Sequence, residues 1–195
     1  EYQLEKLKAI LKVKAHRFDQ WGWKEPRTCL FLDVYRKLIP RAKHLVIVRE
    51  YVAVVHSLLK RDFDALDSRY WHRSLFTRRT WKLFSKNGKR KRYYRKNATE
   101  YLQVWMDYNE HILDMLDKMP QDDYLVINYS LLETRDTDVF SFLTGKWDFK
   151  LEYFPFGKVY KKELISAKND IDRLIKDPAL IRKARELGDR FKGYM

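Results

Sequence analysis

The apolar residues of this 195-residue chain follow two patterns, which are helical spacing over most of the length and two short continuous runs. The runs are 44–49 (HLVIVR) and 124–129 (YLVINY). Continuous apolar runs of this length, rich in β-branched residues, are typical of strands that are buried in a parallel sheet. The pattern therefore predicts two buried strands, one in each half of the chain.

Apolar residues at helical spacing predict the remaining elements. The expected helices cover 2–16, 30–38, 51–61, 98–118, 136–143 and 178–191. Asn97 and Glu100 are spaced like a capping box, so we place the start of the fourth helix beside them. Asp177 followed by Pro178 is a good N-cap and first helical residue for the last helix. Helices that alternate with buried strands in this order are typical of a layered α/β domain.

The positive charge of the chain is concentrated in one stretch. The sequence has 41 Lys and Arg against 27 Asp and Glu, which gives a net charge of +14. Residues 78–96 (RRTWKLFSKNGKRKRYYRK) hold ten of the basic residues and no acidic one, and the rest of the chain is close to balanced. The charge excess is therefore a local feature that needs a local explanation.

The basic stretch lies within a longer polar segment, 62–96, and interleaves aromatic residues with cations. Aromatic faces can stack nucleic-acid bases while cations hold the phosphates. The same residues can hold an anionic glycan, and a solvated loop with incidental charge is the third alternative. Because 62–96 falls between two expected core helices, we favour an acceptor-side segment over a nucleic-acid site. Its candidate substrate contacts are Trp81, Arg90, Arg92 and Tyr93.

The composition gives no support to several classes of protein. With Cys29 as the single cysteine, neither an internal disulfide framework nor a multi-cysteine zinc site is expected. The five histidines are scattered, so we expect no metal. No apolar run reaches the roughly 18–20 residues of a membrane helix, and no secretory signal is recognised. The single cysteine favours a cytoplasmic protein, with a Golgi lumen location and the oligomeric state left open.

The segment 48–61 (VREYVAVVHSLLKR) holds a candidate anion site. Arg49 stands at the carboxyl end of the first expected strand, where ligands of open parallel sheets bind. The following helix offers free backbone N–H groups at its N-terminus, and Ser57 adds a hydroxyl more than one turn later. A guanidinium with a hydroxyl suits a phosphate. On spacing alone, however, an Arg at a sheet edge and a Ser bonded to its own helix is the commoner explanation.

Five segments around this pair occur in an order that can be recognised. They are WGWKEPRT at 21–28, LIPRAKHLVIVREYVAVVHSLLKR at 38–61, WMDYNEHIL at 105–113, YLVINYSLLE at 124–133 and VFSFLTG at 139–145. Together they resemble the sulfotransferase family that uses 3′-phosphoadenosine 5′-phosphosulfate, and its bacterial and carbohydrate-type branches more than the cytosolic aryl branch. The resemblance covers about residues 20–145. The spacing from Arg49 to Ser57 is its most specific part.

The resemblance implies a fold, which is a three-layer α/β/α domain with a parallel sheet, related to the phosphate-loop NTPases. We therefore expect 1–195 to be a single sulfotransferase-like domain, with 62–96 as a basic aromatic insertion. The Gly- and Ser-rich loop with which the family cradles the 5′-phosphosulfate has no match, because the six glycines are isolated. Since the family places that loop well upstream of Lys24, we expect a chain that is N-terminally and catalytically incomplete.

The resemblance also implies roles for individual residues. Arg49 and Ser57 match the residues that bind the 3′-phosphate of the nucleotide. Lys24 matches a lysine beside the transferred sulfuryl group, where a cation stabilises charge on the leaving phosphate. Tyr129 matches a tyrosine near the adenine, and the matching helix motif at 105–109 is interpreted as packing.

The general base that removes the proton of the acceptor hydroxyl is not defined by the motifs. The aryl branch has a histidine where this chain has Pro26. Glu25 is the nearest candidate for the base, and His16 is the second.

The predicted function is transfer of a sulfuryl group from 3′-phosphoadenosine 5′-phosphosulfate to a hydroxyl, with a carbohydrate such as an anionic glycan as the favoured acceptor. The step is expected to be a single in-line displacement that needs no metal. Two alternatives stay open. One is a non-enzymatic binding module that uses the 78–96 patch for nucleic acid or an acidic polymer, and the other is a nucleotide kinase of related fold.

Overall fold

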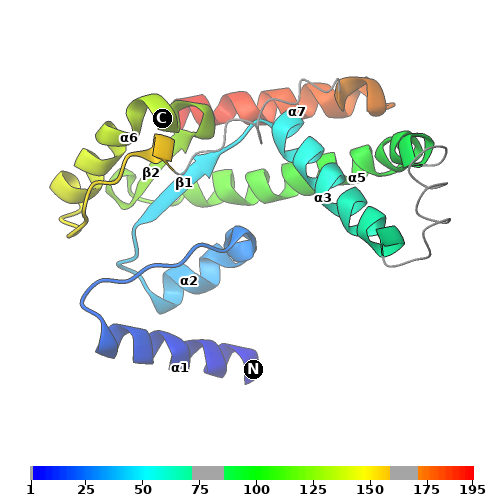
Figure 1. The fold of residues 1–195 in the computed structure, drawn as a ribbon. Helices are drawn as coiled ribbons and strands as arrows, with labels where there is room; N and C mark the ends of the chain where they lie inside the picture. The colour runs from blue at the N-terminus through cyan, green and yellow to red at the C-terminus, as the bar shows by residue number, and fades with distance from the viewer. Residues whose placement is uncertain (1, 72–85, 159–170) are drawn as a thin grey trace. The chain divides into compact units, whose positions relative to one another are not determined.

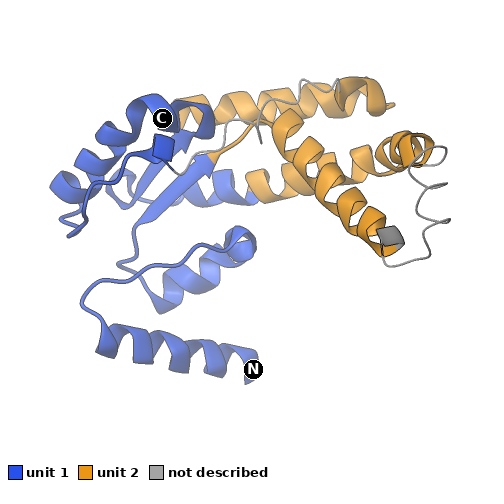
Figure 2. Cartoon of the chain, viewed as in Figure 1, with its two compact units in different colours: residues 1–47, 111–160 blue, residues 48–110, 161–195 orange. Residues whose placement is uncertain are grey.

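The computed structural model describes residues 2–71, 86–158 and 171–195, and Figure 1 shows their course. These residues are mostly helical and contain one two-stranded sheet. They form two compact units, which Figure 2 colours separately. Unit 1 contains residues 1–47 and 111–160, and unit 2 contains residues 48–110 and 161–195. The single domain over 1–195 stays a prediction.

Unit 1 contains the sheet, in which β1 (His44–Val48) and β2 (Tyr124–Asn128) pair in parallel. Its helices are α1 (Tyr2–Arg17), α2 (Leu32–Leu38), the end of α5 (Lys86–Leu116) and α6 (Leu132–Ser141). Short 3-10 helices cover Pro26–Phe31, Gln121–Asp123, Tyr129–Leu131 and Phe156–Lys158, and a π-helical turn covers Phe142–Lys146. Its buried residues are Leu32, Leu113, Met115, Leu116, Val126, Ile127, Leu132 and Trp147.

The predicted three-layer α/β/α fold, related to the phosphate-loop NTPases, is wrong. Both strands lie where the apolar runs predicted them, but the described residues form only this two-stranded sheet between helices. The sequence contains two continuous apolar runs, and its other apolar residues have helical spacing, which favours helices. The larger sheet was implied by the family resemblance alone, and no further pattern in the chain supports it.

The prediction that the first strand is buried also fails. Leu45 and Ile47 of β1 are 41% and 47% exposed. Because alternate side chains of a strand point to the same face, these two residues show that one face of β1 is open to solvent. A further layer over this face would be needed to bury them.

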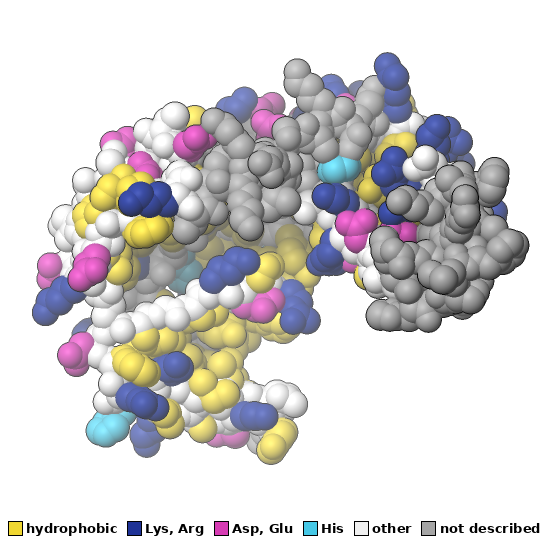
Figure 3. All heavy atoms as spheres, in the orientation of Figure 1, with side chains coloured by type: hydrophobic (Ala, Val, Ile, Leu, Met, Phe, Trp, Pro, Cys, Tyr) yellow, Lys and Arg dark blue, Asp and Glu magenta, His cyan; other side chains and the backbone are white. Residues whose placement is uncertain are grey.

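The predicted N-terminal helix is confirmed as α1, but it has no buried residue. Ile10 and Val13 are 49% and 62% exposed. Figure 3 shows hydrophobic side chains gathered over α1 and α2, with Lys and Arg among them. The apolar residues of α1 therefore add little to the core of unit 1.

Unit 2 is built from helices. They are α3 (Tyr51–Trp71), most of α5, α7 (Pro178–Arg190) and the 3-10 helices Ile171–Leu174 and Phe191–Tyr194. Its core contains Tyr51, Val55, Leu59, Phe63, Ala98, Leu102, Trp105, Met106, Ile171, Ala184, Leu187 and Phe191. The start of α7 is confirmed, since the Asp177 side chain accepts a hydrogen bond from the backbone N–H of Ala179 at 2.9 Å.

α3 and α5 pack against each other in opposite directions. At one end, the ring of Tyr51 lies 5.9 Å from the ring of Trp105, centroid to centroid. At the other end, the Asp67 carboxylate accepts a hydrogen bond from the ammonium group of Lys86 at 2.5 Å. Residue numbers rise along α3 as they fall along the facing part of α5, so the two helices are antiparallel.

The predicted start of the fourth helix is wrong, because α5 already begins at Lys86. Asn97 lies inside this helix and donates a side-chain hydrogen bond to the carbonyl of Tyr93, one turn back, at 2.7 Å. A side chain that bonds to the preceding turn cannot cap a new helix start. The spacing of Asn97 and Glu100 matches a capping box, but these residues do not cap a helix here. In the same way, α3 extends to Trp71, beyond the predicted end at residue 61.

Candidate functional site

Arg49 and Ser57 lie on one strand-to-helix connection in unit 2. Arg49 directly follows β1, and α3 begins two residues later. The carbonyl of Glu50 accepts the first hydrogen bonds of α3, from the backbone N–H groups of Ala53 at 3.1 Å and Val54 at 3.2 Å. Arg49 is half-buried and Ser57 is exposed. The residue that carries the guanidinium, the first turn of α3 and the Ser57 hydroxyl therefore belong to one continuous strand-to-helix segment.

The backbone of Arg49 is held by Trp105 of α5. The indole Nε1 of Trp105 donates a hydrogen bond to the carbonyl of Arg49 at 3.1 Å. Trp105 is buried, and its own carbonyl accepts a hydrogen bond from the Asn109 side chain at 2.7 Å. The helix motif that the sequence indicated as packing thus also fixes the residue proposed to bind phosphate.

Sequence reasoning missed a polar network at the first turn of α3. The buried Tyr51 hydroxyl donates to the Asp172 carboxylate at 2.7 Å, and Arg185 of α7 donates to the same carboxylate at 2.5 Å and to the Tyr51 hydroxyl at 3.4 Å. Burial, followed by the hydrogen bond to Asp172, raises the pKa of Tyr51. The partners are 121 and 134 positions from Tyr51, and no local pattern could have indicated them.

Lys24 lies in unit 1, in a segment that its neighbours fix in place. The indole of Trp23 donates to the Thr28 hydroxyl at 3.1 Å, and its ring lies 5.0 Å from the ring of Tyr35 on α2. Lys24 is exposed and has no hydrogen bond or ion pair with the residues that the structure describes. The side chain before Lys24 is therefore held by Thr28 and Tyr35, whereas the Lys24 ammonium group is exposed to solvent.

Glu25 caps the 3-10 helix Pro26–Phe31. Its carboxylate accepts hydrogen bonds from the backbone N–H of Arg27 at 3.3 Å and from the Arg27 guanidinium at 3.1 Å. These two hydrogen bonds, the backbone one first, lower the pKa of Glu25. A carboxylate with a lowered pKa is a weaker proton acceptor. The second candidate base, His16, is exposed near the end of α1.

Tyr129 lies in unit 1 and opens the 3-10 helix that follows β2. Its ring is half-buried and meets Phe156 edge to face at 6.0 Å. The Asn128 side chain before it accepts hydrogen bonds from the backbone N–H of Ser130 at 2.9 Å and from the Ser130 hydroxyl at 2.8 Å. Of the four residues predicted to contact the nucleotide, Arg49 and Ser57 belong to unit 2, and Lys24 and Tyr129 belong to unit 1.

Three of the four predicted substrate contacts fall in the first turns of α5. Arg90 and Arg92 are exposed there, and Trp81 lies outside the described residues. Tyr93 is half-buried, with its hydroxyl 3.1 Å from the Tyr101 hydroxyl and its ring 5.9 Å from Phe63 of α3. The side chain of Tyr93 therefore takes part in the packing between α3 and α5.

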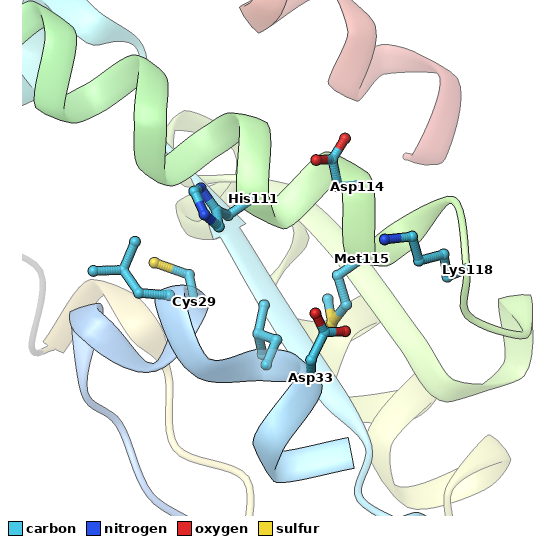
Figure 4. A pocket seen from close by; sticks show the side chains of 8 residues that line it. Cys29, Asp33, His111, Asp114, Met115 and Lys118 are labelled. Carbon is cyan, nitrogen blue, oxygen red and sulfur yellow. The ribbon is translucent and has the colours of Figure 1, made fainter. Parts of the chain in front are cut away.

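A pocket of about 250 Å³ lies in unit 1, apart from the predicted site residues. It is lined by Cys29, Leu30, Leu32, Asp33, His111, Asp114, Met115 and Lys118. Figure 4 shows Asp33 beside Met115, and Cys29 on the side of His111. The Cys29 thiol donates to the Pro26 carbonyl at 3.0 Å, and burial raises its pKa, so it stays protonated at neutral pH.

No group of three or more His, Cys, Asp and Glu side chains within the described ranges is arranged to hold a metal ion.

Comparison of the chain with protein families, characterised proteins and solved structures gives no match. Among the helices of the described residues, none has the length and apolar character needed to cross a bilayer. The support for a function therefore comes from the sequence motifs and from the local geometry around them.

Proposed function

We propose that this chain is a sulfotransferase component that binds 3′-phosphoadenosine 5′-phosphosulfate, with Arg49 and Ser57 on the 3′-phosphate. The observation that carries the proposal is the connection at the end of β1. Arg49 follows the strand directly, α3 begins two residues later, and Ser57 is exposed on that helix. This strand-to-helix connection supports the proposal whatever the number of strands in the sheet. The motif at 21–28, which contains Lys24, supports it independently.

In the proposed reaction, the oxygen of an acceptor hydroxyl attacks the sulfur of the phosphosulfate. The bond from sulfur to the phosphate oxygen breaks, and adenosine 3′,5′-bisphosphate leaves. Lys24 stabilises the negative charge that develops on the leaving phosphate, and Tyr129 contacts the adenine. The acceptor proton passes to a base, a role to which Glu25 is weakly suited by its lowered pKa. A carbohydrate hydroxyl is the proposed acceptor, in the cytoplasmic compartment that a single cysteine favours.

The test is a comparison of two nucleotides by calorimetry. Adenosine 3′,5′-bisphosphate and adenosine 5′-monophosphate differ only in the 3′-phosphate, so their difference in affinity isolates that group. We expect Arg49→Ala to remove this difference and to weaken binding of the bisphosphate by about 10- to 100-fold, the range for a hydrogen bond to a charged group. Ser57→Ala should reduce the difference, while Arg49→Lys should retain part of it.

Ser68 offers a matched control for Ser57 on the same helix. It is exposed on α3, and its hydroxyl already donates to the carbonyl of Ala65 at 2.8 Å. Ser68→Ala should leave the affinities for both nucleotides unchanged. Equal binding of the two nucleotides by the wild type, or an Arg49→Ala variant that still distinguishes them, would overturn the proposal.

A further inference from the structure

Four residues of α3 and α5 form a second candidate site in unit 2. The ring of His56 on α3 meets the ring of Tyr94 on α5 edge to face, with centroids 6.3 Å apart. Lys60 stands one turn after His56 on α3, and Arg90 stands one turn before Tyr94 on α5. Because the two helices are antiparallel, going forward along α3 from His56 to Lys60 and backward along α5 from Tyr94 to Arg90 leads in the same direction from the ring contact. Lys60 and Arg90 therefore lie on the same side of it, one on each helix.

The charges of this cluster are not balanced by carboxylates. Neither Lys60 nor Arg90 forms an ion pair or hydrogen bond with the residues that the structure describes. Burial lowers the pKa of His56, and the positive charges of Lys60 and Arg90 lower it further. Asp64, one turn beyond Lys60, is the acidic group that acts on the Tyr94 side of the contact. Two cations thus act on one histidine, and neither forms an ion pair within the described residues.

The surroundings extend this positive surface along α5. Residues 86–96 contain seven Lys and Arg and no acidic residue, and Arg90, Lys91, Arg92, Arg95 and Lys96 are exposed. Figure 3 shows Lys and Arg side chains over α3 and α5 beside a histidine, with some Asp and Glu side chains among them. Lys86 pairs with Asp67, while the exposed cations that follow it on α5 lie on a helix segment without acidic residues. Such a row of cations attracts a polymer that carries many negative charges.

The tyrosines of this part of α5 are not displayed for base stacking. The rings of Tyr93 and Tyr94 lie 5.9 Å and 6.3 Å from the buried Phe63 of α3. Proteins that bind single-stranded nucleic acid combine a cationic groove with aromatic side chains that are free to stack on bases. In the described part of the stretch, the aromatic residues instead serve the packing of α3 on α5, and the solvent side carries cations.

We propose that Lys60 and Arg90, beside the imidazole of His56, bind the sulfate or carboxylate groups of an anionic polysaccharide. The guanidinium of Arg90 can hold such a group with two parallel hydrogen bonds, and the ammonium of Lys60 adds a point charge. The further basic residues of α5 bind neighbouring groups along the polymer. This binding surface does not depend on sulfuryl transfer, and it would exist in a chain that binds no nucleotide.

The experiment follows the imidazole protons of the full chain by NMR as a heparin hexasaccharide is added at about 0.15 M salt, where long-range attraction is screened. An anion between Lys60 and Arg90 offsets their effect on His56, so its pKa should rise toward the ordinary value. Lys60→Gln and Arg90→Gln should each weaken binding by about two- to fivefold, as for single exposed charges. Asp64→Asn removes the nearby negative charge and should strengthen binding.

Lys192 supplies the matched control for charge, because it is exposed in the same unit and pairs with Asp189. Lys192→Gln makes the same change in net charge and should leave hexasaccharide binding unaltered. Equal weakening by Lys192→Gln, or an unchanged His56 pKa with bound hexasaccharide, would overturn the proposal. So would a single-stranded oligonucleotide of equal charge that binds more tightly and shifts His56, since that result would assign the surface to nucleic acid.

Discussion

The indole N–H of Trp105 donates a hydrogen bond to the backbone carbonyl of Arg49 at 3.1 Å. This contact joins a buried residue of α5 to the residue that begins the candidate phosphate site. Because a carbonyl that is held in place fixes the adjacent peptide planes, it restricts the directions that the Arg49 side chain can take. Preorganisation of this kind reduces the cost of binding an anion.

The first prediction concerns Trp105→Phe, which keeps an aromatic ring and removes the N–H group. We expect the free energy of unfolding to fall by about 1–2 kcal/mol, because the Arg49 carbonyl loses its partner inside the protein. Affinity for adenosine 3′,5′-bisphosphate should also fall, by about three- to tenfold, since Arg49 is less well positioned. Urea denaturation and calorimetry measure the two effects separately.

Trp147 provides the control for that experiment. It is also buried, and its indole donates to the Asp122 carbonyl at 2.9 Å in unit 1. Trp147→Phe should cost a similar amount of stability, while the nucleotide affinity stays as in the wild type. If both tryptophan variants weakened nucleotide binding equally, Trp105 would have no positioning role at Arg49.

The second prediction concerns Tyr51→Phe, which removes the buried hydroxyl that donates to Asp172. The Asp172 carboxylate keeps Arg185 but loses one of its two donors, so the free energy of unfolding should fall by about 1–3 kcal/mol. Tyr153→Phe is the exposed counterpart, because the Tyr153 hydroxyl donates to Asp136 at 3.1 Å near the surface. Denaturant midpoints should show a clearly larger loss for Tyr51→Phe than for Tyr153→Phe.

Local patterns predicted local structure in this chain. Both strands lie within the apolar runs at 44–49 and 124–129, and Asp177 caps α7 through its side chain as expected. Such features depend on residues within one or two turns of each other, so the sequence contains their cause. The strand-to-helix connection at Arg49 could be predicted for the same reason.

Long-range features could not be predicted in this way. The Tyr51–Asp172 hydrogen bond joins residues 121 positions apart, and neither residue belongs to a motif that indicates the other. The three-layer fold was an inference from a family resemblance, and a resemblance in motifs does not specify how many strands this chain forms. At Asn97 a local signal gave a wrong prediction. The spacing indicated a helix start, but α5 already begins at Lys86, where it contacts α3, and Asn97 lies inside it.

The third prediction concerns pH. Burial is the main cause that lowers the pKa of both His44 and His56. The unfolded chain, with an ordinary histidine pKa of about 6.5, then binds more protons than the folded chain just below that pH. The free energy of unfolding should therefore be highest above about pH 6.5 and should fall as the pH drops toward the folded-state pKa values.

Urea denaturation at pH 7.5 and at pH 5.5 tests this sign. His44→Asn and His56→Asn should each reduce the difference in stability between the two pH values. His16→Asn is the control, because His16 is exposed near the end of α1 and should leave the difference unchanged. A wild-type protein that is more stable at pH 5.5 than at pH 7.5 would contradict the prediction.

The fourth prediction concerns substitutions of Gly188 on α7, which lies next to the Trp105 ring. A Cβ atom at Gly188 would lie 3.9 Å from the Trp105 ring, which is ordinary van der Waals contact, and Gly188 does not have a positive φ. Gly188→Ala should therefore raise the free energy of unfolding by about 0.5–1 kcal/mol, because alanine loses less backbone freedom in a helix interior. Gly188→Leu should do the opposite, since its longer side chain must displace the ring and with it the donor to the Arg49 carbonyl. Thermal denaturation of the two variants should give midpoints on opposite sides of the wild type, and a lower midpoint for Gly188→Ala would show that the α7–Trp105 contact is tighter than this.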